Sequence, residues 1–261
     1  MSERRPLRPL AVTMQGALTE AWSNRSGFWT QVLAMVVNDV VWIGFWLLFF
    51  HQVGTVRGWD SSSILLLFAV LTTAGGITLG FFSNARRVGR LAIDGELDAL
   101  LTLPVPPLAY LLVRRVDSTN IGDLVFGLVL FAVAGSPTPE RIALFAAGVV
   151  ASTALMTGFL VVVGSLAFFG GRSESGDLGF HAILLLSSYP ADIFTGATRT
   201  LLYTAVPAAF VATVPSRLIS SFDAGRAVAL LVAAAVFAFG GWALFTLGLR
   251  RYASGSVWTR A

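Results

Sequence analysis

Long apolar runs alternate with short polar segments along the chain. A run of about 20 apolar residues is long enough to cross a bilayer as an α-helix. The pattern predicts six such spans, at residues 32–50, 64–82, 118–134, 142–169, 178–198 and 227–249. We therefore expect an all-α polytopic membrane protein with six transmembrane helices, which forms a single transmembrane domain over residues 1–261.

The segment before the first span, residues 1–28, has a different pattern. Its apolar side chains recur at helical spacing, at Leu10, Met14, Leu18, Ala21 and Trp22. Polar and basic residues occupy the positions between them. An amphipathic helix of this kind lies in the membrane interface instead of crossing the bilayer. We predict an N-terminal interfacial helix here, with a disordered tail as the alternative.

The segment before the last span, residues 199–224, contains an apolar stretch that is too short to cross a membrane. The stretch runs from Leu201 to Val214, is interrupted by Pro207 and is followed by Pro215. Short, proline-broken helices are tolerated at membrane depth only where they pack on protein. We therefore expect a re-entrant helical segment on the extracellular side.

The composition agrees with a membrane location and excludes several kinds of site. Hydrophobic residues make up 56% of the chain and charged residues only 12%, against about 25% charged residues in a soluble domain. There is no Lys and no Cys. A P-loop needs a Lys on the nucleotide phosphates, so the chain contains no Walker A motif, and any ATP-driven work requires a partner. The absence of Cys excludes thiolate metal sites.

The arginines are distributed unevenly between the two predicted sides of the membrane. Thirteen lie on the side of the termini, at positions 4, 5, 8, 25, 86, 87, 90, 114, 115, 172, 250, 251 and 260. Five lie on the other side, at positions 57, 141, 199, 217 and 226. The positive-inside rule then predicts that both termini are cytoplasmic. Because most arginines flank apolar runs, the net charge of +4 does not indicate nucleic-acid binding.

The cytoplasmic loop at residues 83–120 carries the most informative pattern. Three acids, Asp94, Glu96 and Asp98, are expected at the start of a short helix, where negative charge suits the helix dipole. Its apolar side comprises Leu97, Leu100, Leu101 and Leu103, and Pro104 ends the helix. Such a helix can dock in a groove of a soluble partner and transmit the partner's motion to the spans. A loop helix without a partner is the alternative.

This loop resembles a known family. The segment from Gly95 to Val105, GELDALLTLPV, resembles the loop of type 2 ATP-binding-cassette (ABC) exporter permeases. Together with Tyr189-Pro190 and the Pro207-Ala-Ala-Phe run before Pro215, it is similar to a bacterial subfamily of these permeases. The chain differs from the commoner loop in having Asp94 and Gly95 before Glu96, which leaves open which acid makes the main partner contact.

The resemblance implies a function, a set of partners and a location. It implies the permease subunit of an ABC transporter in the bacterial cell membrane, which exports or flips a hydrophobic or amphipathic molecule. Two ABC ATPase subunits would bind ATP and Mg, a second permease chain, identical or related, would complete the dimer, lipid would surround it, and this chain would hold no cofactor. The implied coupling helix spans about Asp94–Leu103. The implied ATPase-coupling residues are Asp94, Glu96, Leu97, Asp98, Leu100, Leu101 and Pro104.

Two other classes of protein compete with this interpretation. A secondary transporter or channel would use acids inside the membrane, and the candidates are Asn38, Asp39 and Asp192, with Asp123 as a further acid. A membrane enzyme would need a catalytic or metal-binding cluster. His51 and His181, the only histidines, are far apart in sequence and flank different spans. We therefore expect a transport subunit and not an enzyme.

Overall fold

In the computed structural model, residues 7–23, 25–171 and 174–252 are described, and these residues form helices without any β-strand. The α-helices are α1 Leu7–Ser23, α2 Arg25–Val53, α3 Ser61–Phe81, α4 Val88–Ile93, α5 Asp98–Leu101, α6 Pro107–Val113, α7 Ile121–Ala134, α8 Pro139–Ser165, α9 Ala167–Gly170, α10 Ser175–Ser187, α11 Gly196–Tyr203, α12 Val214–Ser220 and α13 Ala224–Arg251. Short 3₁₀ helices η1 Ser83–Arg87, η2 Ser118–Asn120 and η3 Ala191–Ile193 and the π-helix η4 Ala209–Thr213 connect them.

Four helices among the described residues are long and apolar enough to cross a membrane: α2, α3, α8 with its continuation to Gly170, and α13. A fifth crossing is formed if α6 and the helix at Ser118–Ala134, which are bent by 69°, count as one broken span. The helix α10, in the predicted span at residues 178–198, has only 13 residues. The membrane character and the all-α fold are thus confirmed, whereas the number of six spans stays a prediction.

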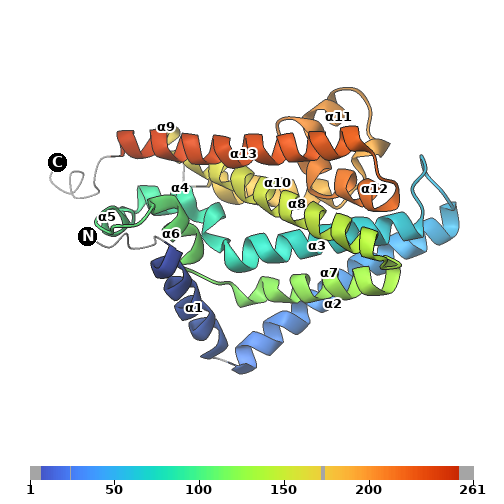
Figure 1. The fold of residues 1–261 in the computed structure, drawn as a ribbon, viewed down its shortest axis with the longest axis horizontal. Coiled ribbons are helices and arrows are strands. Elements are labelled where there is room, and N and C mark those ends of the chain that lie inside the picture. The colour runs from blue at the N-terminus through green and yellow to red at the C-terminus, as the bar shows by residue number, and fades with distance from the viewer. Residues whose placement is uncertain (1–6, 24, 172–173, 253–261) are drawn as a thin grey trace.

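The helix α3 lies at the centre of the bundle, and most of its side chains are buried. It packs on α7 and α8, and α13 packs along α8 (Figure 1). Glycines allow these close approaches. A Cβ atom added to Gly241 of α13 would lie 2.7 Å from the carbonyl oxygen of Gly158 on α8, so a side chain there would push the two helices apart.

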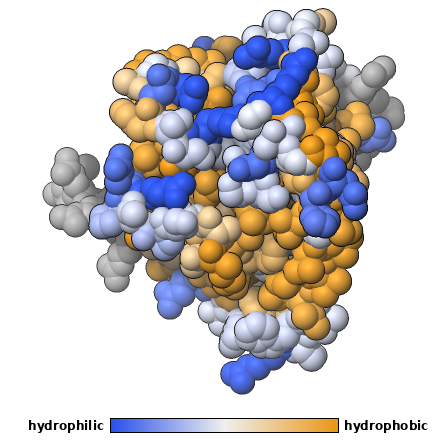
Figure 2. Space-filling view, turned by 90° about the vertical axis from the view of Figure 1, so that its right-hand side faces the viewer, coloured by the Kyte–Doolittle hydropathy of each residue, from blue (hydrophilic) through white to orange (hydrophobic). Residues whose placement is uncertain are grey.

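The bundle has two ends with different elements (Figure 1). One end, called the loop end here, carries α1, α4, α5 and α6. The opposite end, called the far end, carries α11 and α12 together with the starts of α3, α8 and α13. Each of these starts has a side-chain N-cap, from Asp60, Thr138 and Asp223 respectively. Figure 2 looks onto the far end, where hydrophilic residues lie across the upper and middle parts, beside a hydrophobic flank.

Within the predicted N-terminal segment, residues 7–23 form α1, which contacts α6, and residues 25–28 belong to α2. Ala17 is buried against the protein, whereas Leu18 and Trp22 from the predicted apolar face are exposed. An exposed apolar side suits a helix in the membrane interface. The location of α1 at the membrane surface is still a prediction.

Two local boundaries differ from the predictions. The helix predicted from Asp94 to Leu103 is split, because Gly95 has a positive φ of 75° and turns the chain between α4 and α5. Pro215 does not close the apolar stretch before the last span. It lies in the first turn of α12, where a proline does not disrupt helical hydrogen bonds, and the helix continues to Ser220.

Candidate functional site

The segment from Ile93 to Leu103 at the loop end, called the coupling loop here, is attached to the core through two leucines. Leu97 and Leu100 are 1% and 4% exposed and belong to the main hydrophobic core. The turn before them is closed by bonds from the Glu96 amide to the Leu91 carbonyl and from the Asp98 amide to the Gly95 carbonyl. The loop is therefore held to the bundle from within.

The outer face of the coupling loop is apolar and exposed. Ile93, Leu101 and Leu103 are 45%, 46% and 38% exposed, and Pro104 is exposed beside them. Removing one such side chain from water contributes roughly 1.5–3 kcal/mol when it becomes fully buried. The predicted apolar side of one helix is thus divided between an inward pair and an outward group, and only the outward group is available to a partner.

Ion pairs tie the coupling loop and its neighbours together. Glu96 accepts a bond at 2.9 Å from Arg114, the residue that follows α6. Arg90 of α4 pairs with Asp177 of α10 at 2.6 Å. These pairs are partly exposed and individually weak, so they orient the loop more than they stabilise it.

The end of α13 also meets the loop. Burial and the Asp98 carboxylate raise the pKa of Tyr252 to about 12. The three predicted acids differ in their surroundings. Asp94 is exposed, Glu96 is half-exposed in its ion pair with Arg114, and Asp98 interacts with Tyr252. The structure therefore brings the predicted acids to one surface, but in three different environments.

A polar cavity of about 960 Å³ is lined by residues of α1, η1 and α6, beside the contact between α1 and α6. Its lining includes Gln31, Arg87, Glu96, Arg114 and Arg115. Burial, followed by the charge of neighbouring Arg115, lowers the pKa of Arg87 from its ordinary value. The lining thus combines residues of α1 with charged residues of the loop end.

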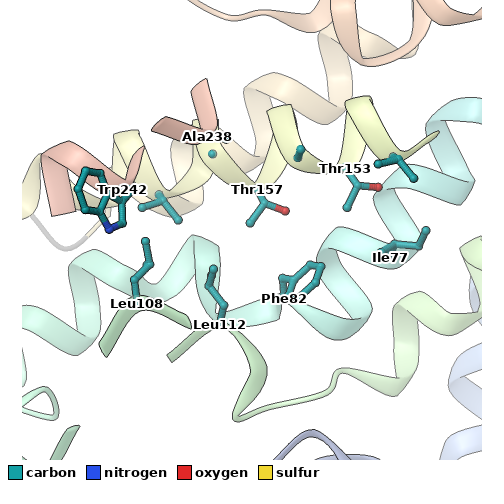
Figure 3. A pocket seen from close by; sticks show the side chains of 12 residues that line it. Ile77, Phe82, Leu108, Leu112, Thr153, Thr157, Ala238 and Trp242 are labelled. Atoms are coloured by element: carbon teal, nitrogen blue, oxygen red, sulfur yellow. The ribbon is translucent and has the colours of Figure 1, made fainter. Parts of the chain in front are cut away.

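An apolar pocket of about 410 Å³ lies between α3, α6, α8 and α13 (Figure 3). Figure 3 shows Thr153 and Thr157 of α8 facing Ile77, Phe82, Leu108 and Leu112 across this space. Both threonine hydroxyls are buried and have no hydrogen-bond partner among the described residues. The exposed side chains of Val150 and Trp242 form part of the pocket lining and place an opening at the bundle surface.

Sequence reasoning did not find this pocket. The one available signal was a pair of threonines four residues apart, Thr153 and Thr157, inside an apolar run. A spacing of four places both side chains on one helix face, but Thr hydroxyls in helices usually bond to the preceding turn. Only the arrangement of the facing helices shows that these two residues line a cavity.

The predicted intramembrane residues occupy two separate places. Asp39 of α2 and Asp123 of α7 line one small cavity, with Asn38 at its exposed side. Asp192 lies instead at the far end, where it accepts hydrogen bonds from Arg217 at 3.4 Å and from Tyr203 at 3.2 Å. Asp192 therefore belongs to a separate polar network and does not line the cavity of Asp39.

The histidines do not meet. His51 is exposed near the end of α2, and His181 of α10 contacts the carbonyl of Asp177 at 2.7 Å. No group of three His, Cys, Asp or Glu side chains that could hold a metal ion occurs within residues 7–23, 25–171 and 174–252.

Comparison with known families shows which family of membrane proteins the chain belongs to. The family model described as ABC-2 family transporter protein matches residues 36–256. The chain belongs to the ABC-2 transporter family. It is thus a membrane protein of the permease type, and permeases of this family lack an ATPase site of their own and work with an ABC ATPase. Neither the curated proteins nor the solved structures that were compared gave a match to this ABC-2 protein.

Proposed function

We propose that this ABC-2 protein is the transmembrane subunit of an exporter that moves a hydrophobic or amphipathic molecule across or between the leaflets of the bacterial cell membrane. Two ABC ATPase subunits hydrolyse ATP with Mg, and a second permease chain completes the pathway. The observation that carries this proposal is the coupling loop, which is fixed to the core on one side and apolar and exposed on the other.

The geometry of the loop suits the transmission of force. A partner that presses on Leu101 and Leu103 acts on a segment whose Leu97 and Leu100 are embedded in the same core as α3 and α8. Close-packed interiors move as rigid bodies under such a displacement instead of deforming continuously. Closure of the ATPases would thus reorient α3, α6 and α7 and open the pathway to the opposite side.

The arginine distribution supports the orientation required by this mechanism. The loop end holds Arg86, Arg87, Arg90, Arg114 and Arg115, which the positive-inside rule assigns to the cytoplasm. The coupling loop then faces the compartment that contains ATP. The far end, with α11 and α12, faces outward and caps the pathway.

The apolar pocket supports a hydrophobic or amphipathic cargo. Its lining is almost entirely apolar, and its volume of about 410 Å³ falls within the roughly 300–1,000 Å³ of pockets for small organic ligands. Thr153 and Thr157 also line the pocket, and their hydroxyls are buried. A molecule with an apolar chain can place that chain in the pocket.

The proposal is tested by weakening the outer face of the coupling loop. In the Leu101→Ser plus Leu103→Ser double variant, we expect a folded protein, because both side chains are exposed. Co-purification of the ATPase in mild detergent should fall, and ATP-driven transport with it. Phe222→Ser is the matched control, since Phe222 is 60% exposed at the far end.

A Glu96→Gln plus Leu101→Ser variant tests the acid in the same assay. Because Glu96 pairs with Arg114 of the same chain, this variant reports both docking and loop orientation. Unchanged ATPase assembly together with unchanged transport in both double variants would refute the coupling-loop assignment.

One observation favours a second candidate function, an ion-driven secondary transporter or channel. Two acids, Asp39 and Asp123, are buried together inside the membrane region. Acids inside a membrane often mark ion pathways. Transport that continues after ATP depletion and stops after collapse of the ion gradients would favour this second function.

A further inference from the structure

The described part of the molecule contains one small cavity that the coupling mechanism does not use. It has a volume of about 190 Å³ and lies between α2, α3, α7 and α10. Two carboxylates line it, Asp39 from α2 and Asp123 from α7, and they are 6% and 8% exposed. The Asp39 Oδ2 and Asp123 Oδ1 atoms have no hydrogen-bond partner among the described residues.

The cavity provides no positive charge for these two carboxylates. No Arg or His is among its lining residues. Arg86 does not neutralise the two carboxylates either. It pairs with Asp117, the residue before η2, at 3.8 Å, and it is not among the residues that line the cavity. A buried carboxylate without a partner is costly, and two carboxylates that share one site do not both ionise. The site therefore suits one monovalent cation.

The walls distinguish an organic cation from a metal ion. They are formed largely by Met35, Trp42, Phe68, Leu71, Leu184 and Leu185. The hydroxyls of Thr72 and Ser188 already donate to the carbonyls of Phe68 and Leu184. Ca²⁺ and Mg²⁺ require about six or more oxygen ligands, and this set is too poor in oxygen. Aromatic faces beside a carboxylate instead attract an alkylated ammonium through cation–π contacts.

The size and opening of the cavity define the rest of the ligand. At about 190 Å³ it is smaller than the roughly 300 Å³ at the lower end of pockets for drug-sized molecules. Only a small headgroup fits inside. Asn38 and Leu185, on α2 and α10, line the cavity and are exposed, so a tail attached to the headgroup can leave between these two helices into lipid.

We propose that the cavity between Asp39 and Asp123 binds the ammonium headgroup of an amphipathic organic cation. One carboxylate pairs with the ammonium, the other carries a proton, and Trp42 and Phe68 cover the alkyl groups. This inference rests on the proposed function, because it names the class of cargo. It also gives the two buried acids a role in a protein that is driven by ATP.

The test is a binding measurement on the purified full chain in nanodiscs, without ATPase or ATP. The probe is dodecyltrimethylammonium, whose charge does not change with pH, and its uncharged comparison is the carbon isostere 2,2-dimethyltetradecane. We expect the wild-type protein to bind the cation at least about tenfold more tightly than the isostere, as one charge-assisted contact provides. Binding of the cation should weaken as the pH is lowered and the carboxylates take up protons.

Variants assign this preference to the two acids. The Asp39→Asn plus Asp123→Asn double variant should lose about tenfold or more in affinity for the cation and retain its affinity for the isostere. Each single variant keeps one carboxylate that can pair with the ammonium and should lose less affinity than the double variant. Glu140→Gln, which changes an exposed acid at the far end, is the control and should bind like the wild type. If a variant does not fold, the affinities of the wild-type protein for the two probes still test the proposal.

Three results would overturn the inference. They are equal wild-type affinity for the two probes, unchanged cation affinity in the double variant, and a protein whose stability responds to pH at these acids without binding the cation. Because the measurement contains no ATPase, any of these results leaves the proposed ATP-driven function standing. Loss of ATPase coupling would, conversely, leave the cation site intact.

Discussion

At the scale of single residues, Asp60 shows how a local sequence signal becomes stability. Its carboxylate caps α3 and accepts hydrogen bonds from the Ser63 amide at 2.8 Å and from the Ser62 hydroxyl at 2.9 Å. Hydrogen bonds from the Ser63 hydroxyl and amide lower the pKa of Asp60 below its ordinary value. An acid before three serines and a long apolar run is a typical N-cap signal, so this feature is visible in the sequence.

Replacement of the cap should reduce stability in a pH-dependent manner. Asp60→Ala is expected to cost about 0.5–2 kcal/mol at pH 7. Because the pKa of Asp60 is lower in the folded state, its ionised form stabilises the fold above the unfolded-state pKa. This contribution is lost as the pH falls through the folded-state pKa, below the ordinary value of 3.8. Thermal unfolding of both proteins at neutral and acid pH measures the difference. Asp60→Asn keeps a capping side chain that does not titrate, so it should remain near wild-type stability at neutral pH. An equal loss of stability in Asp60→Ala at all pH values would contradict the account.

The polar network around Asp192 depends on contacts that a sequence does not display. Arg217 donates to Asp192 and, at 2.9 Å, to the carbonyl of Gly58, and its guanidinium lies 4.0 Å from the centre of the Trp59 ring. These bonds hold the α2–α3 turn against α12. The proximity of residues 58, 192 and 217 is a product of the fold, so the sequence alone did not predict this network.

Loss of this network should loosen the far end. Asp192→Asn leaves Arg217 without its carboxylate and is expected to destabilise the protein by about 1–3 kcal/mol. The melting temperature in detergent should fall, while assembly with the ATPase at the opposite end persists. Glu140→Gln, at the same end, serves as the neutral comparison. A melting temperature of Asp192→Asn equal to that of the control would show that the network does not stabilise the far end.

At the scale of elements, the long helices could be predicted directly, whereas the boundaries and packing of the short ones could not. The apolar length of α2, α3, α8 and α13 is a local property, so the sequence predicts them directly. The split of the coupling loop at Gly95, the inward turn of Leu97 and Leu100, and the end of α10 at Ser187 depend on which neighbours each side chain meets. Periodicity in segments of four to eight residues is too short to specify these features.

Helix spacing gives a matched pair of variants on α13. A Cβ atom at Gly241 would lie 2.7 Å from the Gly158 carbonyl oxygen, whereas one at the adjacent Gly240 would meet nothing within 4 Å. Gly241→Ala is therefore expected to destabilise by about 1–3 kcal/mol through overpacking. Gly240→Ala should be neutral or stabilise by up to about 1 kcal/mol through helix propensity. Thermal unfolding of the two variants in the same detergent measures this contrast, and equal behaviour would argue against the close α8–α13 contact.

At the scale of the whole molecule, the fold explains why both described ends of the chain reach one side. The helix α1 and the end of α13 both lie at the loop end (Figure 1). This arrangement agrees with an even number of crossings and with the arginine distribution. The ABC-2 family could be predicted from the coupling-loop motif. The apolar pocket and the Asp39–Asp123 cavity could not, because they form only where helices distant in sequence come together.

Accessibility labelling tests the predicted topology. The chain has no Cys, so single cysteines can be introduced without first removing any. Cysteines at Arg57 and Pro137, in turns at the far end, should react with an impermeant reagent from outside intact cells, and one at Arg115 should not. Positions 172 and 260 lie outside the described residues and are predicted to be cytoplasmic. Outside labelling at 172 or 260 would overturn the six-span topology.

The most direct test of ATP coupling is a cross-link from the outer face of the coupling loop. Leu101→Cys carries a thiol-specific photo-cross-linker in native membranes, with Phe222→Cys as the matched position at the far end. Both residues are exposed and apolar, so they differ mainly in the end of the bundle that they mark. The account predicts that position 101 cross-links to a chain containing a P-loop ATPase and that position 222 does not. A cross-link to the ATPase from position 222 alone, or from neither position in membranes that support ATP-driven transport, would contradict it.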